Sequence, residues 1–594
     1  MTNDEDKFTL NCLLEHQESP IRVKAMKNSQ VIELQKLVWQ QLANALAGVD
    51  SNTLALWKIE RPIPANELKA FANDLPMKDI KTIAMKLEPL DVISTSFTVP
   101  PDDTCLHIVV TVPADKKRRR EEDTDTSVAK RAKIVEDHEH LISAIKTKYP
   151  APSMGAKVSE FRKLQANSET RIKNGRPLDY TSPPISIYHP VFAEFPDHAA
   201  DPSTIPSADI LKATHEIFQF SSEFYTDEPQ RQNKINELFC ELLGMSIHPM
   251  SPGDGSCNDG AVVAFCPVFN TNALCAIVQY KLEMGLGGTD AAVQGTLGFA
   301  KWQQLQGWAS VCCCPTFIIA IVGPYVCILG AVIADDVLVE PLTDFLWLGG
   351  TPHLNEHVVT AARVFDTLKT CLEQWQTFYQ GLRLPTDNAR LFVYPYFNSY
   401  RKDDRDVHLT YVDRIGFKDE RASRALFEAK TDTDNRVVVK FVKDYSARGH
   451  KLLAQHGLAP ALHCFKSIGG GMHVVVMDLV QVKTLFELVW DDIPQTIRQT
   501  ILDDIKKAVC LLHDAGLVFG DLRPPNVMVV DQPETGHKGA MLIDFDWCGD
   551  EGEARYPAVL NDTQITWHEG VVRGGLILKE HDMHQLAMLE PRST

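Results

Sequence analysis

The sequence lacks the features by which several common classes of protein are recognised. Its 14 cysteines include no C-x-x-C motif, so the usual spacing of a cysteine zinc site is absent. The segment Met1–Lys7 is acidic and has no apolar core, so no ordinary secretory signal is visible. The net charge is −18, which excludes a body that binds polyanions as a whole. The scattered cysteines indicate a reduced, intracellular compartment.

One uncharged stretch, Val311–Ala334, is long enough to span a membrane. Gly323 and Pro324 interrupt it, and β-branched residues fill both halves. Two buried strands joined by a turn explain this pattern better than a transmembrane helix. We therefore expect no membrane partner. With 594 residues, 44% of them hydrophobic, the chain is long enough for about three domains with buried cores.

The segment 8–112 is predicted to form a small α+β domain. Its apolar periodicity predicts strands at 8–14, 21–26, 53–59 and 106–112, with a helix at 30–46. One helix covering one face of a sheet, in this order, is the pattern of a ubiquitin-like β-grasp fold.

Three short motifs in this segment resemble a known family. They are an L-x-C-L strand at Leu10–Leu13, a Leu-Trp-Lys strand at Leu56–Lys58, and a closing His-Ile-Val-Val-Thr-Val-Pro run at His107–Pro113. Together they resemble the ubiquitin-like N-terminal domain of Crinkler-type effector proteins, here residues 1–113. Phe8–Leu14 stands in place of the oomycete L-x-L-F-L-A-K motif, as in fungal relatives. The resemblance implies a virulence effector that works in a nucleus, of its own or a host cell, with non-classical secretion as one option.

The segment 114–140 is a basic linker. Five consecutive cations, Lys116–Arg120, precede an acidic spacer and a second basic cluster, Lys130–Lys133. Two clusters about ten residues apart are typical of a bipartite nuclear-import signal. The import machinery is therefore a predicted partner. The alternative is a solvated linker, or one that contacts the phosphates of nucleic acid.

The central part of the chain is predicted to contain both extended and regular segments. Repeated prolines predict extended segments along a surface up to about residue 205, after a short helix at 136–146. Beyond them, the apolar periodicity predicts helices at 227–243, 290–306 and 357–382, strands at 261–265 and 275–281, and the two apolar strands around Gly323.

This α-β-β-α-β-β order resembles restriction-endonuclease-like domains, and we assign residues 141–388 to such an α/β domain. In that family an Asp and an E-x-K motif on adjacent strands bind a divalent metal and position an attacking water. Asp259 and Lys281 match these positions, whereas Gln279 replaces the acid and is a weaker ligand for a hard cation. A further acid is expected from Glu237 or Glu241. The resemblance implies DNA as a partner, and the alternative is a nuclease fold that does not cleave.

The most informative stretch lies further along the chain. Asp521 follows a short apolar run, Asn526 comes five residues later, and Asp544 ends the second of two apolar strands that follow. A hairpin of this kind brings the three polar side chains together at the same end of its two strands. Phosphoryl transfer needs such a set, because one carboxylate orients the attacking hydroxyl while an amide and a second carboxylate hold magnesium. The alternative is a surface hairpin with unrelated acids.

The pattern D-L-x-x-x-N, followed about twenty residues later by D-F, resembles the catalytic core of protein kinases. The resemblance implies a compact protein-kinase-like domain at 389–594, with ATP and Mg²⁺ as cofactors. In that family's terms, Asp521 orients the substrate hydroxyl and Arg523 neutralises the moving phosphoryl group. Asn526 and Asp544 then bind Mg²⁺.

Further elements of the same resemblance lie on either side of this stretch. Lys440 ends the predicted strand 435–442 and resembles the lysine that holds nucleotide phosphates. Met477 precedes the expected hinge, where backbone groups meet adenine. Asp582 resembles the acid that braces the catalytic loop. Helices are expected at 446–457 and 493–515, with strands at 407–412, 424–429 and 473–479.

The sequence also departs from the kinase pattern. No G-x-G-x-x-G occurs between residues 391 and 437, where Gly416 is the lone candidate, and no acid lies between 445 and 465 to pair with Lys440. Phe519-Gly520 replaces the usual His-Arg, and Asp546 replaces the glycine of the metal-binding triplet.

The predicted fold class is therefore α+β multidomain, with a β-grasp, a restriction-endonuclease-like and a protein-kinase-like domain. The first functional hypothesis is ATP- and Mg²⁺-dependent transfer of phosphate to a nuclear protein substrate. The alternatives are a catalytically inactive effector that binds nuclear proteins or DNA, and a metal-dependent DNA nuclease.

Overall fold

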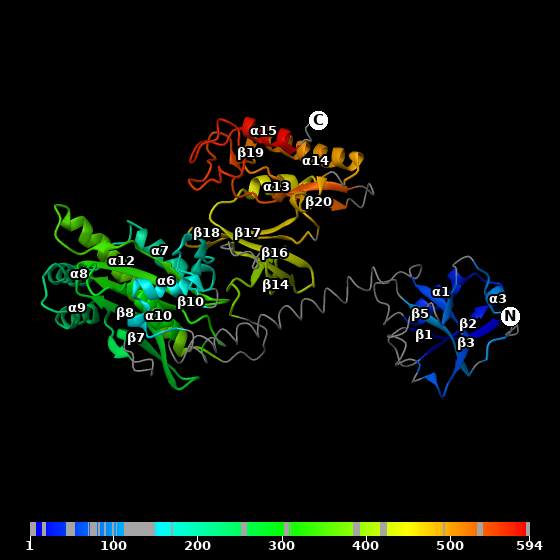
Figure 1. Cartoon of the computed structure of the whole chain (residues 1–594), viewed down its shortest axis with the longest axis horizontal. Coiled ribbons are helices and arrows are strands. Elements are labelled where there is room, and N and C mark those ends of the chain that lie inside the picture. Colours follow the sequence, from blue (N-terminus) through cyan, green and yellow to red (C-terminus); the bar gives the residue numbers. More distant parts are fainter. Residues whose placement is uncertain are drawn as a thin grey trace. The chain divides into compact units, whose positions relative to one another are not determined.

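The computed structural model of the chain divides into two compact units, Met1–Ala129 and Lys130–Thr594 (Figure 1). The structure describes residues 7–14, 20–42, 54–68, 71, 80, 83–87, 91–97, 100–102, 104–111, 149–167, 170–250, 258–301, 308, 311–383, 392–415, 424–480, 482–490, 493–531 and 538–589. The basic linker with its import signal, the helix expected at 136–146 and Gly416 lie outside the described residues.

The first unit is built on a mixed five-stranded sheet. Its elements are β1 (Lys7–Leu14), β2 (Ile21–Met26), α1 (Val31–Gln41), β3 (Ala55–Pro64), β4 (Ala84–Lys86), α3 (Ile93–Ser96) and β5 (Cys105–Thr111). The strand order is β2-β1-β5-β3-β4, with β1 and β5 parallel and the other pairs antiparallel. Val31, Leu34 and Val38, one face of α1, are fully buried against the sheet. This is the β-grasp arrangement that the apolar periodicity predicts.

The second unit begins with a large mixed sheet. Its elements are α5 (Pro152–Gly155), α6 (Val158–Ala166), η5 (Leu178–Tyr180), η6 (Ile185–Ile187), α7 (Val191–Ala200), α8 (Ala208–Ser221), α9 (Glu228–Leu243), β6 (His248–Met250), β7 (Asn258–Cys266), β8 (Thr271–Lys281), α10 (Ala291–Lys301), β9 (Thr316–Val322), β10 (Tyr325–Ile333), β11 (Val337–Pro341), β12 (Leu346–Trp347) and α12 (Leu354–Gln380). The strand order is β11-β10-β9-β8-β7-β6, with β12 on β10. Strands β8 and β9 are parallel, and α10 crosses between them.

The uncharged stretch Val311–Ala334 forms two paired strands, as predicted. Strands β9 and β10 are antiparallel around Gly323, and most of their residues are fully buried. Among the described residues, no helix is both long and apolar enough to cross a lipid bilayer.

The prediction of extended surface segments before residue 205 is wrong. This region contains α5, α6 and α7, and α7 packs along α12. Phe192 and Phe195 of α7 are buried in the main hydrophobic core. Pro196 lies inside α7, at its sixth residue, so the proline does not prevent the helix from forming.

A second sheet and a helical layer follow. The elements are β13 (Ser399–Lys402), β14 (Arg405–Arg414), β15 (Leu426–Thr431), β16 (Arg436–Val442), α13 (Ala447–Gln455), β17 (Leu462–Gly469), β18 (Met472–Asp478), η7 (Leu485–Glu487), α14 (Gln495–Asp514), β19 (Leu517–Val518), η9 (Pro524–Asn526), β20 (Val527–Asp531), β21 (Lys538–Leu542), β22 (Gly549–Asp550) and α15 (Lys579–Leu589). Strands β13-β14-β15-β16-β18-β17 form an antiparallel sheet. The β20–β21 hairpin packs on α14, and α13 packs against α14 (Figure 1).

The two sheets of this unit share one hydrophobic core. The core joins residues of the first sheet and α12, such as Phe317 and Trp375, to residues of the second sheet, such as Tyr411 and Phe441. A separate core lies under α13, α14 and the β20–β21 hairpin. The second sheet is therefore packed with the preceding domain as well as with the helical layer that follows it.

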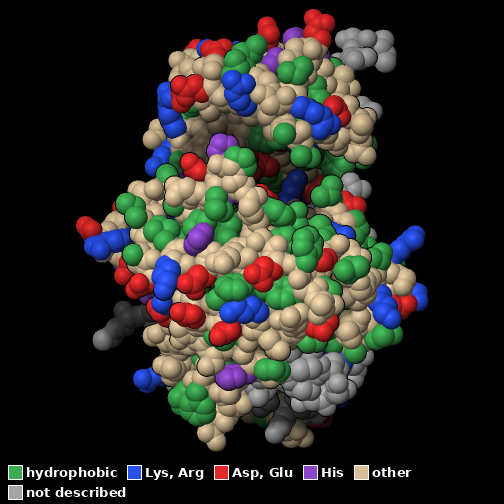
Figure 2. Space-filling view, turned by 90° about the vertical axis from the view of Figure 1, so that its left-hand side faces the viewer, with side chains coloured by type: hydrophobic (Ala, Val, Ile, Leu, Met, Phe, Trp, Pro, Cys, Tyr) green, Lys and Arg blue, Asp and Glu red, His purple; other side chains and the backbone are tan. Residues whose placement is uncertain are grey.

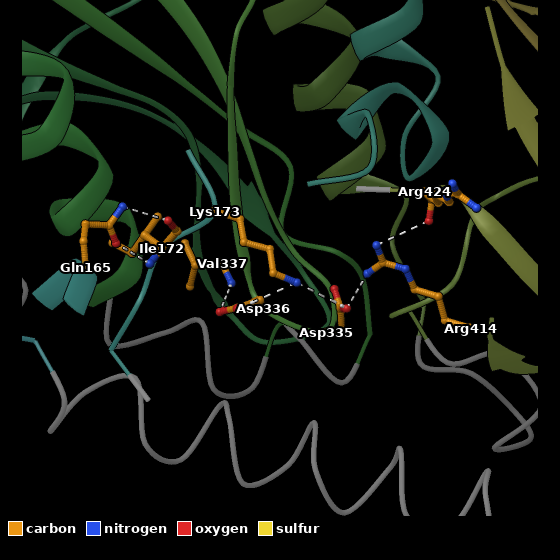
Figure 3. A network of polar contacts seen from close by, with 8 residues as sticks. All are labelled: Gln165, Ile172, Lys173, Asp335, Asp336, Val337, Arg414 and Arg424. Atoms are coloured by element: carbon orange, nitrogen blue, oxygen red, sulfur yellow. Dashed lines mark hydrogen bonds and ion pairs between the residues drawn. The ribbon is translucent and has the colours of Figure 1, made fainter. Parts of the chain in front are cut away.

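An ion-pair network also fastens the second sheet to the first (Figure 3). Arg414, at the end of β14, donates from Nη1 to Oδ2 of Asp335 in the β10–β11 turn, over 2.7 Å. Lys173 lies 3.7 Å from the same carboxylate. Arg414 also donates to the backbone oxygen of Arg424. Arg414 is only 7% exposed, so this contact takes place away from bulk water.

Candidate functional site

A cavity of about 740 Å³ lies between the second sheet and the helical layer. Its walls include all six residues that the kinase resemblance assigns to a nucleotide and metal site, namely Lys440, Met477, Asp521, Arg523, Asn526 and Asp544. Figure 2 shows a deep hollow in the upper part of the molecule, with basic and acidic side chains at its bottom. Residues more than one hundred positions apart in sequence thus meet in one cavity of a size suited to a small ligand.

Asp521 and Asn526 form the floor of this cavity. Both are buried, and the amide nitrogen of Asn526 donates to the Asp521 backbone oxygen at 2.9 Å and to Oδ2 at 2.8 Å. Arg523 donates from Nη2 to Oδ2 of Asp521 at 2.6 Å and from Nε to Oδ1. The Asp521 carboxylate is therefore held from two sides by side chains of its own loop.

Lys440 lies between two carboxylates. Its ammonium donates to Oδ1 of Asp544 and to Oδ1 of Asp546, each at 2.5 Å. Burial opposes ionisation of Asp544, but the lysine charge outweighs it and lowers the pKa of Asp544. Burial and the neighbouring Asp544 charge raise the pKa of Asp546. The single positive charge of Lys440 therefore does not neutralise the negative charges of both carboxylates.

The sequence did not indicate that Asp544 and Asp546 pair with Lys440 in place of an acid on the following helix. Helix α13 follows the lysine strand and carries no acid, and at its centre His450 is fully buried. The His450 ring stacks on Phe545, between the two acids, with ring centroids 4.7 Å apart. Its ring nitrogens contact Tyr445 Oη at 2.7 Å and the Pro460 backbone oxygen at 2.8 Å. An aromatic contact therefore holds the Asp544–Asp546 turn, at a place where protein kinases have an ion pair to the helix.

The burial of His450 predicts how the free energy of unfolding depends on pH. Burial lowers its pKa from 6.5 to about 4, so the ring is neutral in the folded protein and protonated in the unfolded chain below pH 6.5. The stability that this neutral ring contributes is present above pH 6.5 and is lost as the pH falls toward 4. We expect about 2 kcal/mol of this contribution to disappear between pH 7 and pH 5.

Denaturant unfolding of wild type and His450→Gln at the two pH values measures this loss. Other groups titrate in the same range, so the difference between the two proteins is the informative quantity. His450→Gln should lose about 2 kcal/mol less than wild type. His456→Gln, at an exposed position after the same helix, serves as the control and should follow wild type. Equal losses in wild type and His450→Gln would refute the assignment.

Asp582 holds the backbone that precedes Asp521, which is the loop that the sequence assigns to it. Its carboxylate accepts the backbone N–H groups of Phe519 at 2.8 Å and Gly520 at 2.7 Å, and the His513 ring lies 3.0 Å away. Gly520 has a φ of 81°, and a Cβ there would lie 2.8 Å from Ile577. Glycine thus replaces the usual arginine at a position where a side chain is excluded on both conformational and steric grounds.

Two further residues of the cavity were not anticipated. Arg424, whose side chain Figure 3 shows, lines the cavity, and its charge contributes to the lowered pKa of Asp544. Pro184, which belongs to the segment before α7, also lines the cavity. The preceding domain therefore supplies part of the wall, which no local motif could indicate.

The nuclease-like residues come together only in part. Asp259 Oδ2 accepts the Tyr280 backbone N–H at 2.8 Å, and burial raises its pKa. Lys281 lies 3.5 Å from Glu228, in the first turn of α9. Both charges act on Asp259, so these three groups are neighbours.

The acids expected on the body of α9 are not part of this group. Glu237 is exposed and pairs with Lys234 at 3.4 Å, and Glu241 is exposed. Glu228 is the acid that the fold brings to Lys281 instead. Gln279 is fully buried, and its Cγ lies 3.5 Å from where a Cβ on Gly295 of α10 would be.

Comparisons with known proteins identify the first unit. Residues 8–111 match the model of the Crinkler effector protein N-terminal domain, which confirms the resemblance seen in the sequence of this segment. No curated protein sequence matches the chain. Among solved structures, the Cydia pomonella granulovirus kinase PK-1 is similar with 17% identity and a TM-score of 0.25. That match covers 30% of this chain and spans 65% of the length of the viral kinase chain, and at this level it carries no argument about activity.

Proposed function

We propose that this chain, which carries a Crinkler N-terminal domain, is an effector whose C-terminal domain binds ATP with Mg²⁺ and transfers phosphate to a protein. The observation that carries the proposal is the meeting of Lys440, Asp521, Asn526 and Asp544 in one cavity. Sequence spacing indicates Asp521, Asn526 and Asp544, and the kinase resemblance adds Lys440. Phosphoryl transfer uses a lysine, two carboxylates and an amide together.

The donor set fits a hard divalent cation. Asp544 and Asp546 share one lysine, and burial together with the neighbouring Asp544 charge raises the pKa of Asp546, so an added cation would favour its ionised form. Because the nitrogen of Asn526 is engaged by Asp521, its amide oxygen is the ligand atom that it offers. Oxygen ligands of this kind suit Mg²⁺. A bound Mg²⁺ supplies positive charge that neutralises and orients phosphate oxygens.

The chain's own residues supply the remaining roles. Lys440 would contact the phosphate oxygens of a bound nucleotide in place of one of its two carboxylates, and that acid would then be available to hold the cation. Asp521, once it faces a substrate hydroxyl, accepts its hydrogen bond, and Arg523 beside it offers a charge that stabilises the transferring group. The apolar wall formed by Val438, Met477, Met528 and Ile543 excludes water from the base of the nucleotide.

Binding of Mg²⁺-ATP is the first test of this proposal. At a nucleotide concentration of 100 times Kd, a ligand that binds only the folded state stabilises it by about 2.7 kcal/mol. We expect the full-length protein to show a rise in melting temperature with Mg²⁺-ATP, measured by differential scanning fluorimetry. Asp544→Asn removes one charge from the acid pair and should abolish most of that rise.

The matched control is Asp503→Asn, on the exposed face of α14 and away from the cavity. It should respond to Mg²⁺-ATP as wild type does. If wild type shows no response, the chain is instead a catalytically inactive effector that binds nuclear proteins or DNA. In that case the closed ion pairs Arg523–Asp521 and Lys440–Asp544 are structural. An equal rise in wild type and Asp544→Asn would place the nucleotide elsewhere.

We further propose that the protein acts in a nucleus, of its own cell or of a host cell, on a nuclear protein substrate. The two basic clusters of the linker 114–140 support recognition by the import machinery. Replacing the five cations Lys116–Arg120 with alanine in the tagged full-length protein tests this assignment. Unchanged nuclear accumulation would remove it.

A metal-dependent nuclease remains the second candidate function. The observation in its favour is the grouping of Asp259, Glu228 and Lys281 at the end of β8. The buried Gln279 occupies the position of a metal-binding acid, and this replacement weakens the case for a nuclease. A plasmid-nicking assay with Mg²⁺ or Mn²⁺ distinguishes a nuclease from a nuclease fold that does not cleave. Nicking by wild type that disappears in Lys281→Ala would support the nuclease, and no nicking by wild type would dismiss it.

A further inference from the structure

A second group of metal-ligating side chains lies outside the cavity. His568, in the segment between β22 and α15, approaches Glu580 and His581 in the first turn of α15. One potential ligand atom from each residue lies within 4.8 Å of those of the other two. We propose that His568, Glu580 and His581 bind a zinc ion that fastens this segment to α15.

The ring of His581 provides the strongest observation. It is 1% exposed, and its Nε2 has no hydrogen-bond partner among the described residues. A Glu580 carboxylate oxygen lies 4.0 Å from this nitrogen. A buried polar nitrogen without a partner is destabilising, so a cation bound there would satisfy it. Its other nitrogen, Nδ1, lies 3.3 Å from the hydroxyl of Tyr556 and from the Leu578 N–H.

The space next to this nitrogen is kept open by a glycine. A Cβ added to Gly570 would lie 3.1 Å from His581 Nε2 and 3.2 Å from His568 Nδ1. The two rings therefore border one small volume that any larger residue at 570 would fill. The ring of His584, one turn along α15, lies 5.4 Å from that of His568, and its Nε2 also has no hydrogen-bond partner within the described parts.

The donor chemistry selects the metal. Two imidazoles and one carboxylate are a zinc ligand set that leaves a fourth position for water or another side chain. Mg²⁺ and Ca²⁺ prefer ligand sets made of oxygen, so they fit poorly. Zinc on Nε2 would place the proton on Nδ1, so the Leu578 N–H, which donates to Nδ1 at 3.3 Å, would give up this long hydrogen bond and the Tyr556 hydroxyl, also 3.3 Å from Nδ1, would accept the proton.

A zinc ion bound at this site would have a structural role. Helix α15 carries Asp582, the acid that accepts the Phe519 and Gly520 N–H groups. The preceding segment 551–578 has little regular structure, and the described contacts to α15 include Gln585 with the Thr566 backbone oxygen. A zinc bridge from His568 to the start of α15 would fix this segment and the brace together. The inference stands whether or not the cavity transfers phosphate.

Metal analysis of the full-length protein tests the proposal. The protein is stripped with a chelator, loaded with Zn²⁺ or Co²⁺, and passed over a desalting column before metal is counted by plasma mass spectrometry. We expect one equivalent of zinc per chain in wild type and its loss in His568→Gln. His568 is partly exposed on a loop, so its replacement should leave the fold intact, which circular dichroism checks. His456→Gln, at an exposed histidine of the same domain, should keep the metal.

The Co²⁺-loaded protein distinguishes this site from a cysteine site. Imidazole and carboxylate ligands give visible ligand-field bands without sulfur-to-cobalt charge-transfer absorption in the near ultraviolet. Glu580→Gln should weaken the affinity and shift these bands. Equal metal content in wild type and His568→Gln would overturn the proposal. Strong charge-transfer absorption that persists in His568→Gln would assign the metal to thiolates instead.

Discussion

Asp521→Ala is expected to reduce phosphate transfer by the C-terminal domain about 10²- to 10⁴-fold, the range that a positioned catalytic base contributes. The reason is geometric. Asp521 is buried at the floor of the cavity and is the carboxylate that Asn526 and Arg523 hold in place. Transfer of radioactive phosphate from ATP to the protein itself, or to a nuclear extract, measures the effect. Mg²⁺-ATP binding should change far less than the rate, because Lys440, Asp544 and Asp546 remain.

Asp514→Ala is the matched control for this experiment. Asp514 is an exposed acid at the end of α14, only seven positions from the catalytic loop residue. It should transfer phosphate at the wild-type rate. Identical labelling by wild type and Asp521→Ala would mean that the signal comes from a contaminating kinase or from another group. Either result would remove Asp521 from the catalytic role.

Asp335→Ala is expected to lower the free energy of unfolding of the second unit by about 3 kcal/mol. Its carboxylate receives the Arg414 guanidinium over 2.7 Å at a site where Arg414 is 7% exposed (Figure 3). Removing the acid leaves a buried cation with its main partner lost, and this penalty exceeds the value of a surface ion pair. Thermal and denaturant unfolding of the full-length protein measures the change.

Two further variants show whether the burial of this pair matters. Asp404→Ala breaks the exposed Arg401–Asp404 pair, 3.3 Å long, and should cost less than about 1 kcal/mol. Asp335→Ala combined with Arg414→Met removes both charges and should recover part of the loss. The unfolding transition whose melting temperature falls in Asp335→Ala should also be the transition whose melting temperature rises with Mg²⁺-ATP. If the two act on separate transitions, the two sheets do not unfold together.

The parts that sequence could predict depend on short-range spacing. The spacing of five positions from Asp521 to Asn526, and the strand pair that leads to Asp544, fix the geometry of one loop and one hairpin. The cavity floor therefore follows from local sequence. Helix α14 follows from the apolar periodicity of residues such as Ile501, Ile505 and Leu512, all of which are buried. The Crinkler N-terminal domain was predictable for the same reason, because one helix and four strands carry clear apolar patterns.

The parts that sequence could not predict depend on contacts between distant segments. The ion pair from Lys440 to Asp546 joins residues 106 positions apart, so the absence of an acid on α13 gave no indication of the substitute. Proline counts predicted an exposed strand-like segment where α7 lies in the core, because packing against α12 outweighs the local preference. The His568 cluster joins a loop to a helix at a spacing that no cysteine-based zinc pattern matches.

The shared core of the two sheets has a practical consequence for anyone who wishes to express the kinase-like part alone. A fragment beginning at residue 389 would separate the second sheet from the first-sheet residues that share its core. It would also lack Asp335, the ion-pair partner of Arg414, and Pro184 of the cavity wall. The shortest fragment that keeps this core closed begins near Tyr149.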